Sequence, residues 1–348
     1  ITDLLKEQNS LTVTVGPGWF RSRIPAFVET EEKARRHNLP RAILGQLELE
    51  YADGSQETIL TDSVWECAES PVRFSEIYDG EHYDASFQPE AWKNVSLLDW
   101  SKDILIPQEG EIIKEQERLC ARSVFVTPAG ETVVDFGQEV TGYVEFSVDA
   151  HAGDLVKILH GEVLDKNGNF YNENYRSAKA DITYTCREGR QIWHPKLTFF
   201  GFRYLEITAT EDVEFTGLIC PVIGSATRET GKMETSHPVV NQLISNIIWG
   251  QRGNYLSVPT DCPQRDERLG WTGDAQMFCK TACYNMDTYA FYRKYLRDIW
   301  TEQKEFGGRV GHVAPSFFRD YDKFNAFWQG GSCAWGDAAV IIPWTLYE

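Results

Sequence analysis

The chain has 348 residues, of which 42% are hydrophobic and 13% aromatic, a composition typical of folded domains and long enough for two or three of them. Its formal net charge of −18 at pH 7 disfavours nucleic acid and anionic membranes as partners, because both bind basic surfaces. No apolar run is long enough to cross a bilayer. Eleven tryptophans and fifteen tyrosines offer ring faces on which a neutral sugar can stack, although most of them are expected in cores.

The eight cysteines are scattered and include no Cys-x-x-Cys pair, so a zinc or redox site is not indicated. Cys279 and Cys283 are four residues apart on a predicted helix and could face each other. Buried free thiols are the simpler interpretation, and they favour a reducing compartment such as the cytoplasm.

Residues 1–106 are expected to form antiparallel β-structure. Residues 11–15 alternate with period two, as a half-buried strand does. Segments 43–51 and 58–61 flank Asp53-Gly54, which is a hairpin turn signal. A charged run at residues 29–36 predicts a solvated helix or loop.

Three acidic residues in this first part could chelate a cation such as calcium, namely Asp79, Glu81 and Asp84. Turn and strand-edge chemistry explains them equally well. The sequence therefore calls for no cofactor, and no residue is assigned as a metal ligand.

Residues 107–223 predict a second β-unit. Strands are expected at 133–138, 142–148 and 199–207, and the turn at 165–169 predicts a further hairpin. From residue 224 onward the apolar spacing becomes helical. Four helices are expected there: one capped by Ser236, one capped by Asp274 and running to residue 284, one over 287–305, and one capped by Asp337. The third has a predicted buried stripe of Tyr292, Tyr295, Leu296 and Ile299.

The segment richest in chemistry is residues 261–276, DCPQRDERLGWTGDAQ. Proline and two glycines interrupt regular structure there, so most of the segment should be a loop. Closely spaced carboxylates and arginines push one another's proton affinities apart, which is how one carboxyl becomes an acid and another a base. A solvated acidic loop is the alternative interpretation of the same composition. The polar and aromatic residues concerned are Asp261, Arg265, Asp266, Glu267, Trp271 and Asp274.

This loop closely resembles the sugar-facing loop of the glycoside hydrolase family 78 α-L-rhamnosidases. The similarity continues in the flanking segments 251–260 and 333–339. It also includes segments 75–85, 160–164 and 174–178, which resemble parts of the family's two β-sandwiches. Packing between domains is the preferred interpretation of the last two segments, and contact of their polar groups with the catalytic barrel or a distant part of the substrate is the alternative.

The resemblance implies two antiparallel β-sandwich domains, at 1–106 and 107–223, followed by the first helical hairpins of an (α/α)6 barrel at 224–348. A ring of twelve helices needs about three times as many helices as the pattern shows, at a typical helix length of about 11–12 residues. We therefore expect the chain to be an internal part of a longer enzyme.

The resemblance also implies roles for individual residues in an inverting hydrolysis that removes terminal α-L-rhamnose. Glu267 matches the general acid, while the general base is expected from a later part of the barrel. Asp261, Asp274 and Arg265 match residues that hold the sugar, and Asp266, which lies beside the acid, is also expected to bind the substrate. Trp271 and Trp335 are expected to face the apolar side of rhamnose, with Trp328 and His312 as weaker candidates.

The expected partner is a small glycoside or polysaccharide that contains rhamnose, and a homo-oligomer is possible. Two alternatives stay open: a carbohydrate-binding protein without catalysis, and an (α/α)6 enzyme that acts on another sugar. The acidic loop argues against the first alternative, because a binding module needs no general acid. Parallel assays with an aryl α-L-rhamnoside and an aryl β-glucoside would separate the second.

Overall fold

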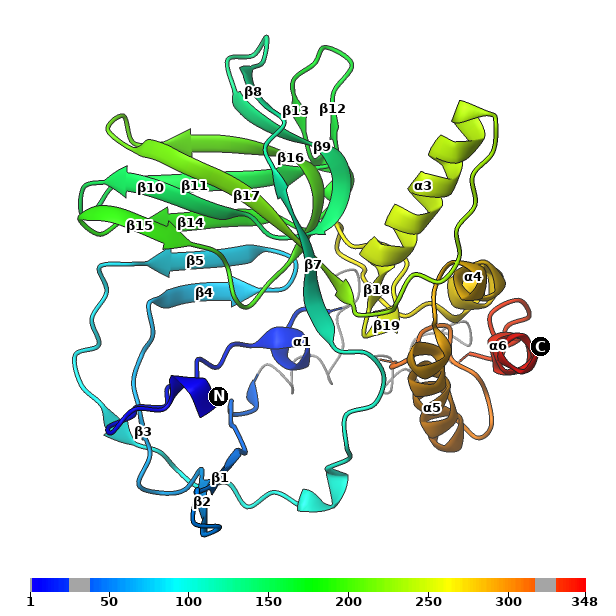
Figure 1. Cartoon of the computed structure of the whole chain (residues 1–348), viewed down its shortest axis with the longest axis horizontal. Coiled ribbons are helices and arrows are strands. Elements are labelled where there is room, and N and C mark those ends of the chain that lie inside the picture. The colour runs from blue at the N-terminus through cyan, green and yellow to red at the C-terminus, as the bar shows by residue number, and fades with distance from the viewer. Residues whose placement is uncertain (1, 25–37, 317–329) are drawn as a thin grey trace.

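The computed structural model describes residues 2–24, 38–316 and 330–348. Strands fill the first two-thirds of the chain and helices the last third, so the strands and the helices gather on opposite sides of the molecule (Figure 1). The predicted order of β-structure followed by helices is confirmed. The charged run at 29–36 and Trp328 lie outside the described residues.

The first part of the chain contains short elements. They are η1 (Thr2–Leu4), α1 (Gly18–Arg21), β1 (Gln46–Glu50), β2 (Gln56–Leu60), β3 (Glu66–Cys67), β6 (Lys93–Asn94) and η2 (Lys102–Ile104). β1 and β2 form the hairpin predicted around Asp53-Gly54. The strand predicted at residues 11–15 is wrong: the segment has no regular structure and is mostly exposed, because no neighbouring strand pairs with it.

An eleven-stranded sheet forms the centre of the molecule. Its main path runs in the order β15-β10-β17-β9-β16-β11-β14-β5-β4, while β7 pairs with β17 and β8 with β9. The strands are β4 (Val72–Glu76), β5 (Gly80–Asp84), β7 (Ile113–Cys120), β8 (Ser123–Val126), β9 (Thr132–Gly142), β10 (Glu145–Ala150), β11 (Leu155–Gly161), β14 (Asp181–Thr185), β15 (Gly189–Trp193), β16 (Phe200–Ala209) and β17 (Glu214–Ser225).

The predicted strands and the turn of the second β-unit are present. The short pair β12 (Val163–Leu164) and β13 (Phe170–Tyr171) forms the hairpin around residues 165–169, and η3 (Glu173–Tyr175) follows it. Alternate residues of β10 and β14 are buried, as expected for strands with one face on a core. The buried side chains join one cluster around Phe146, Phe200 and Phe202.

The hairpin β4–β5 connects the first part of the chain to this sheet. β5 runs parallel to β14, with Glu81 opposite Ile182. Gly80 sits at the closest approach, where a Cβ atom would lie 1.7 Å from the carbonyl oxygen of Asp181. The domain boundaries at 106 and 223 stay predictions, and the pairing shows that residues before 106 share a sheet with residues after it.

Beyond residue 224 the described part of the chain contains four α-helices, as predicted. They are α3 (Pro238–Asn254), α4 (Thr272–Asn285), α5 (Tyr289–Glu305) and α6 (Ala338–Tyr347), and the short strands β18 (Tyr255–Leu256) and β19 (Val258–Pro259) follow α3. The expected stripe on α5 is buried at Tyr292, Tyr295 and Ile299. None of the described helices is both long and apolar enough to cross a membrane.

Two of the predicted helix caps are wrong. The N-cap of α3 is His237 rather than Ser236. Near this end, the N–H and the hydroxyl of Thr235 donate hydrogen bonds to Asn241 Oδ1. Helix α4 begins at Thr272, so Asp274 lies inside its first turn. The positive end of the helix dipole stabilises a carboxylate at that position. Asp337 does precede α6, but its Oδ2 accepts from the N–H of Ala334.

Hydrogen bonds fasten the helical part to the sheet. Thr141 Oγ1 on β9 donates to the carbonyl of Gly253 over 2.8 Å, and Arg252 Nε donates to Gln116 Oε1 on β7 over 2.9 Å. Leu269 and Val313, from the helical part, are buried in the sheet's own core cluster. The loop between β19 and α4 therefore lies on the sheet, and its position depends on both parts.

Candidate active site

The loop between β19 and α4 is anchored by a buried arginine. Arg268 has φ +58° and is 1% exposed. Its guanidinium donates to the carbonyls of Ile77 and Phe199, both over 2.9 Å, and to those of Gln264 and Arg265 in its own loop. Burial lowers the pKa of Arg268. Four carbonyl oxygens replace its water of hydration, so this residue fixes the loop against the sheet.

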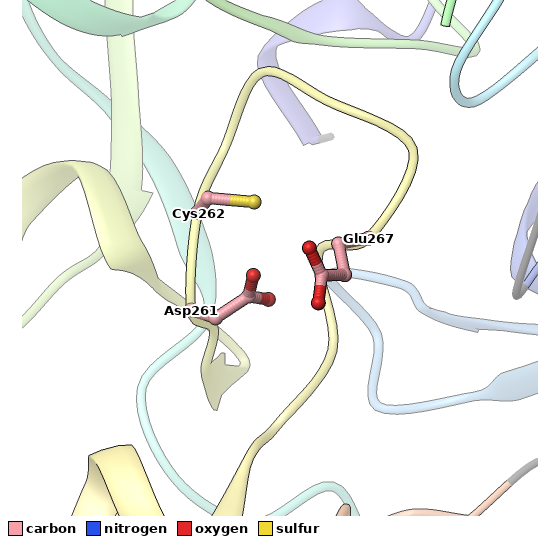
Figure 2. Close-up of side chains that lie close together, drawn as sticks. All are labelled: Asp261, Cys262 and Glu267. Carbon is pink, nitrogen blue, oxygen red and sulfur yellow. The ribbon is translucent and has the colours of Figure 1, made fainter. Parts of the chain in front are cut away.

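Asp261, Cys262 and Glu267 converge at the base of this loop, and their oxygen and sulfur atoms lie within 4.8 Å of one another (Figure 2). Arg265 lies against the two carboxylates: its Nε is 3.0 Å from Glu267 Oε2 and its Nη2 is 3.7 Å from Asp261 Oδ2. The N–H of Leu269 donates to Asp261 Oδ1 over 3.1 Å. The structure thus brings together three of the residues that the sequence singled out.

Burial and the neighbouring charge alter the acidity of this cluster. Burial, aided by the Glu267 charge, raises the pKa of Asp261 to about 6. Burial also raises the pKa of Asp274, with a smaller contribution from Glu267. The buried Cys262 thiol has its pKa raised to about 12, so it is protonated at neutral pH.

The cluster has the residue types of a metal site but not the charge balance of one. Two guanidinium groups already contact Glu267 Oε2. These contacts suit two carboxyls and a cation engaged in acid–base or hydroxyl-binding chemistry.

Asp266 bonds two residues of the segment that follows η3. Its carboxylate accepts hydrogen bonds from Arg176 Nε over 2.6 Å and from the Ser177 hydroxyl over 2.5 Å. Arg176 Nη2 also lies 2.9 Å from Glu267 Oε2, so one guanidinium bridges both acidic residues. Asp266 is 4% exposed.

The two tryptophans lie near the start of α4, and both contact the segment 312–313. Trp271 makes an isolated bridge with Val313, and the N–H of Thr272 donates to the carbonyl of His312 over 2.8 Å. The Trp335 ring lies edge-on to His312, 5.8 Å between ring centroids. A Cβ atom on Gly273 would lie 2.9 Å from the Trp335 indole nitrogen, so the helix start and Trp335 are in close contact.

The acidic residues of the first β-part, which were candidate calcium ligands, have protein partners. Asp79 pairs with Arg23 over 2.7 Å. Glu81 Oε2 accepts the N–H groups of Lys196 and Leu197, and Asp84 accepts from Ser86. The turn and strand-edge interpretation accounts for these contacts.

Sequence reasoning missed several residues that shape the site. Packing between domains was the preferred interpretation of segment 174–178, and its Arg176 and Ser177 contact the loop between β19 and α4. The sequence did not single out either residue, because such a contact joins positions about ninety residues apart. Tyr78, whose hydroxyl donates to the carbonyl of Glu267 over 2.7 Å, and Arg268 were missed for the same reason.

Family models match nearly the whole chain in three consecutive segments. Residues 1–121 match the α-L-rhamnosidase N-terminal domain, residues 126–223 the bacterial α-L-rhamnosidase concanavalin-like domain, and residues 228–348 the bacterial α-L-rhamnosidase six-hairpin glycosidase domain. The predicted fold class, β-sandwich domains followed by the first helices of a six-hairpin barrel, is confirmed.

Curated proteins that are similar to this chain are named as α-L-rhamnosidases. An α-L-rhamnosidase of Streptomyces avermitilis is 37% identical over 98% of this chain and 33% of its own length, and one of Formosa agariphila is 36% identical over 100% and 38%. This chain thus spans about a third of the curated relatives it matches.

Solved structures agree. The crystal structure of the Streptomyces avermitilis enzyme complexed with L-rhamnose covers 87% of this chain and 30% of its own, with a TM-score of 0.79 and 38% identity. That of the Aspergillus terreus enzyme covers 88% and 36%, with a TM-score of 0.79 and 34% identity. The chain belongs to the family 78 α-L-rhamnosidases, of which it carries the N-terminal domain, the concanavalin-like domain and the start of the six-hairpin glycosidase domain.

Proposed function

We propose that the intact protein is an inverting α-L-rhamnosidase and that Glu267 is its general acid. The observation that carries the proposal is the pairing of Asp261 and Glu267 at the base of one loop, with Arg265 against both. The pair stands in the segment that matches a glycosidase domain. Hydrolysis of a glycosidic bond generally needs an acid that protonates the leaving oxygen and a second carboxylate.

The surroundings of Glu267 suit an acid at the edge of a sugar site. Its side chain is 15% exposed, so it is held by protein on most sides and still reaches solvent. Its main chain is fixed by Tyr78 and by the neighbouring Arg268. A positioned carboxyl of this kind contributes about 10²–10⁴-fold to the rate when it protonates a poor leaving group.

The distance between Asp261 and Glu267 does not suit Asp261 as the general base. In inverting enzymes the two carboxyls are about 6.5–9.5 Å apart, which leaves room for the attacking water. Carboxyl oxygens of Asp261 and Glu267 lie within 4.8 Å, which is too close for that arrangement. We therefore give Asp261 a binding role and expect the base from a later part of the barrel, outside these residues.

The remaining residues are proposed to hold the sugar. Asp261, Asp274 and Arg265 would bond the hydroxyls of a terminal rhamnose, since carboxylates accept and a guanidinium fork donates. Trp271 and Trp335 would face the apolar side and the methyl group of this 6-deoxy sugar. Sugar contact by Asp266 stays a prediction, because Arg176 and Ser177 already bond its carboxylate.

The direct test incubates the intact protein with an aryl α-L-rhamnoside and, in parallel, an aryl β-glucoside. We expect release from the rhamnoside only, with β-L-rhamnose as the first anomer seen by NMR. First release of the α anomer would indicate retention and would move Asp261 to the nucleophile role, because retaining pairs are about 5–5.5 Å apart. Hydrolysis of the glucoside alone would support a different sugar specificity, and binding of rhamnose without hydrolysis would support a binding protein.

A further inference from the structure

A chain of polar contacts joins three distant parts of the sequence to Glu267. It begins at Arg23, near the N-terminus, which pairs with Asp79 over 2.7 Å and donates to the Ser177 hydroxyl over 2.9 Å and to the Ser177 carbonyl over 2.7 Å. Ser177 in turn bonds the carboxylate of Asp266 through its hydroxyl and its N–H. The chain of contacts therefore reaches the loop from the sheet side.

Arg176 completes this chain of contacts. Its Nε donates to Asp266 Oδ1 over 2.6 Å, and its Nη2 lies 2.9 Å from Glu267 Oε2. Arg176 has φ +59°, a left-handed conformation that is uncommon for a residue with a Cβ atom. Tertiary contacts must hold such a conformation, and here they are those of Asp266 and Glu267.

We propose that Arg176 is a positioning residue for the catalytic acid: carried by the β-sandwich, it holds the Glu267 carboxyl in place and ties it to Asp266. The proposal rests on the proposed function, in which Glu267 is the general acid. It gives the β-sandwich a part in the chemistry, because the guanidinium that contacts the acid comes from outside the glycosidase domain.

Two guanidinium groups contact the Glu267 carboxylate: Arg176 from the β-sandwich and Arg265 from the loop itself. Arg176 also donates to Asp266, which Ser177 bonds in turn, so it links the acid to a part of the loop that is held in place. Loss of Arg176 removes one of these two guanidinium contacts, so the Glu267 carboxyl should be less firmly oriented.

The experiment measures kcat and KM on two aryl α-L-rhamnosides, one with a poor and one with a good leaving group, for the intact wild-type protein and for Arg176→Gln. We expect kcat on the poor leaving group to fall several-fold, because the carboxyl that protonates it is less well held. We expect a smaller loss on the good leaving group and a nearly unchanged KM, which a general loss of structure would not produce.

Two further variants separate charge from position. Arg176→Lys keeps the charge but cannot bridge two carboxylates, so it should also lower kcat on the poor leaving group. Arg118→Gln is the matched control: Arg118 lies on β7, is 47% exposed and pairs with Glu115 and Glu145, so its loss should change neither kcat nor KM.

The outcomes distinguish the two proposals. A wild-type protein without rhamnosidase activity would contradict the proposed function. An active wild type whose Arg176→Gln variant keeps the wild-type kcat on the poor leaving group would overturn the inference alone. If Arg176→Gln does not fold, Arg176→Lys decides: kcat equal to that of wild type on the poor leaving group would show that the bridge has no positioning role.

Discussion

At the scale of single residues, the site depends on groups that are buried at some cost. Asp261 is the clearest example, because the surrounding protein and Glu267 raise its pKa to about 6. An aspartate in an unfolded chain has a pKa of about 3.9. Between these two values the folded state binds more protons than the unfolded state, so the stability that protonated Asp261 contributes is lost as pH rises through about 6.

We therefore predict that Asp261→Asn stabilises the protein near neutral pH while it impairs sugar binding. The amide cannot ionise, so it avoids the cost of a buried charge, of the order of 1–2 kcal/mol after allowance for the Arg265 contact. Thermal unfolding midpoints at pH 4.5 and pH 7.5 would measure the effect. We expect the unfolding midpoint of the variant to exceed that of wild type at pH 7.5 and to differ little from it at pH 4.5. An equal difference at both pH values would contradict a raised pKa for Asp261.

Residue types alone predicted part of this site. The loop 261–276 combines residues that chemistry uses with residues that interrupt helices, so its candidate residues could be selected from the sequence. Arg176 and Tyr78 could not, because their side chains reach the loop only after the sheet has brought distant segments together. Their local sequence carries no periodic or motif signal for this contact.

At the scale of elements, the prediction succeeded where the local sequence determines the turn or the face. The hairpin β1–β2 was predicted because Asp-Gly favours its turn, and α5 because its apolar residues recur at helical spacing. Residues 11–15 alternate like a strand, but a strand exists only when another pairs with it. The cap of α4 was misplaced because Thr272 is fixed by the distant carbonyls of Gly311 and His312.

Helix α4 also supports a prediction about Trp335. Gly273→Ala would place a Cβ atom 2.9 Å from the Trp335 indole, so the ring must move. We expect kcat/KM on an aryl α-L-rhamnoside to fall at least several-fold, mainly through KM, if Trp335 faces the sugar.

Gly250→Ala is the matched control for that substitution. Gly250 lies in α3, and an added Cβ would meet nothing within 4 Å. Alanine there should leave the kinetics unchanged and stabilise the helix by up to about 1 kcal/mol. Equal kinetics for both alanine variants would remove Trp335 from the sugar site.

At the scale of the whole molecule, the helices present apolar side chains that are exposed among the described residues. Leu243 on α3 is 57% exposed, Met277 on α4 is 80% and Val340 on α6 is 71%. Apolar surface on several neighbouring elements promotes association. In the relatives, the matched region is about a third of a longer chain.

We predict that residues 1–348, expressed alone, self-associate. Light scattering coupled to size-exclusion chromatography should give a mass that rises with concentration above 39.8 kDa. Leu243→Glu together with Val340→Glu should reduce the association, whereas Ile192→Glu, an exposed position on β15 of the sheet, should not. A monodisperse monomer at every concentration would contradict the prediction.

The central claim is that Glu267 is the general acid, and it is tested most directly by Glu267→Gln in the intact protein on two aryl α-L-rhamnosides, one with a poor and one with a good leaving group. We predict a loss of about 10²–10⁴-fold in kcat on the poor leaving group, a much smaller loss on the good one, and nearly unchanged rhamnose binding. Glu214→Gln, an exposed position on β17, should behave as wild type. Equal losses on both substrates, or wild-type rates on the poor one, would contradict the account.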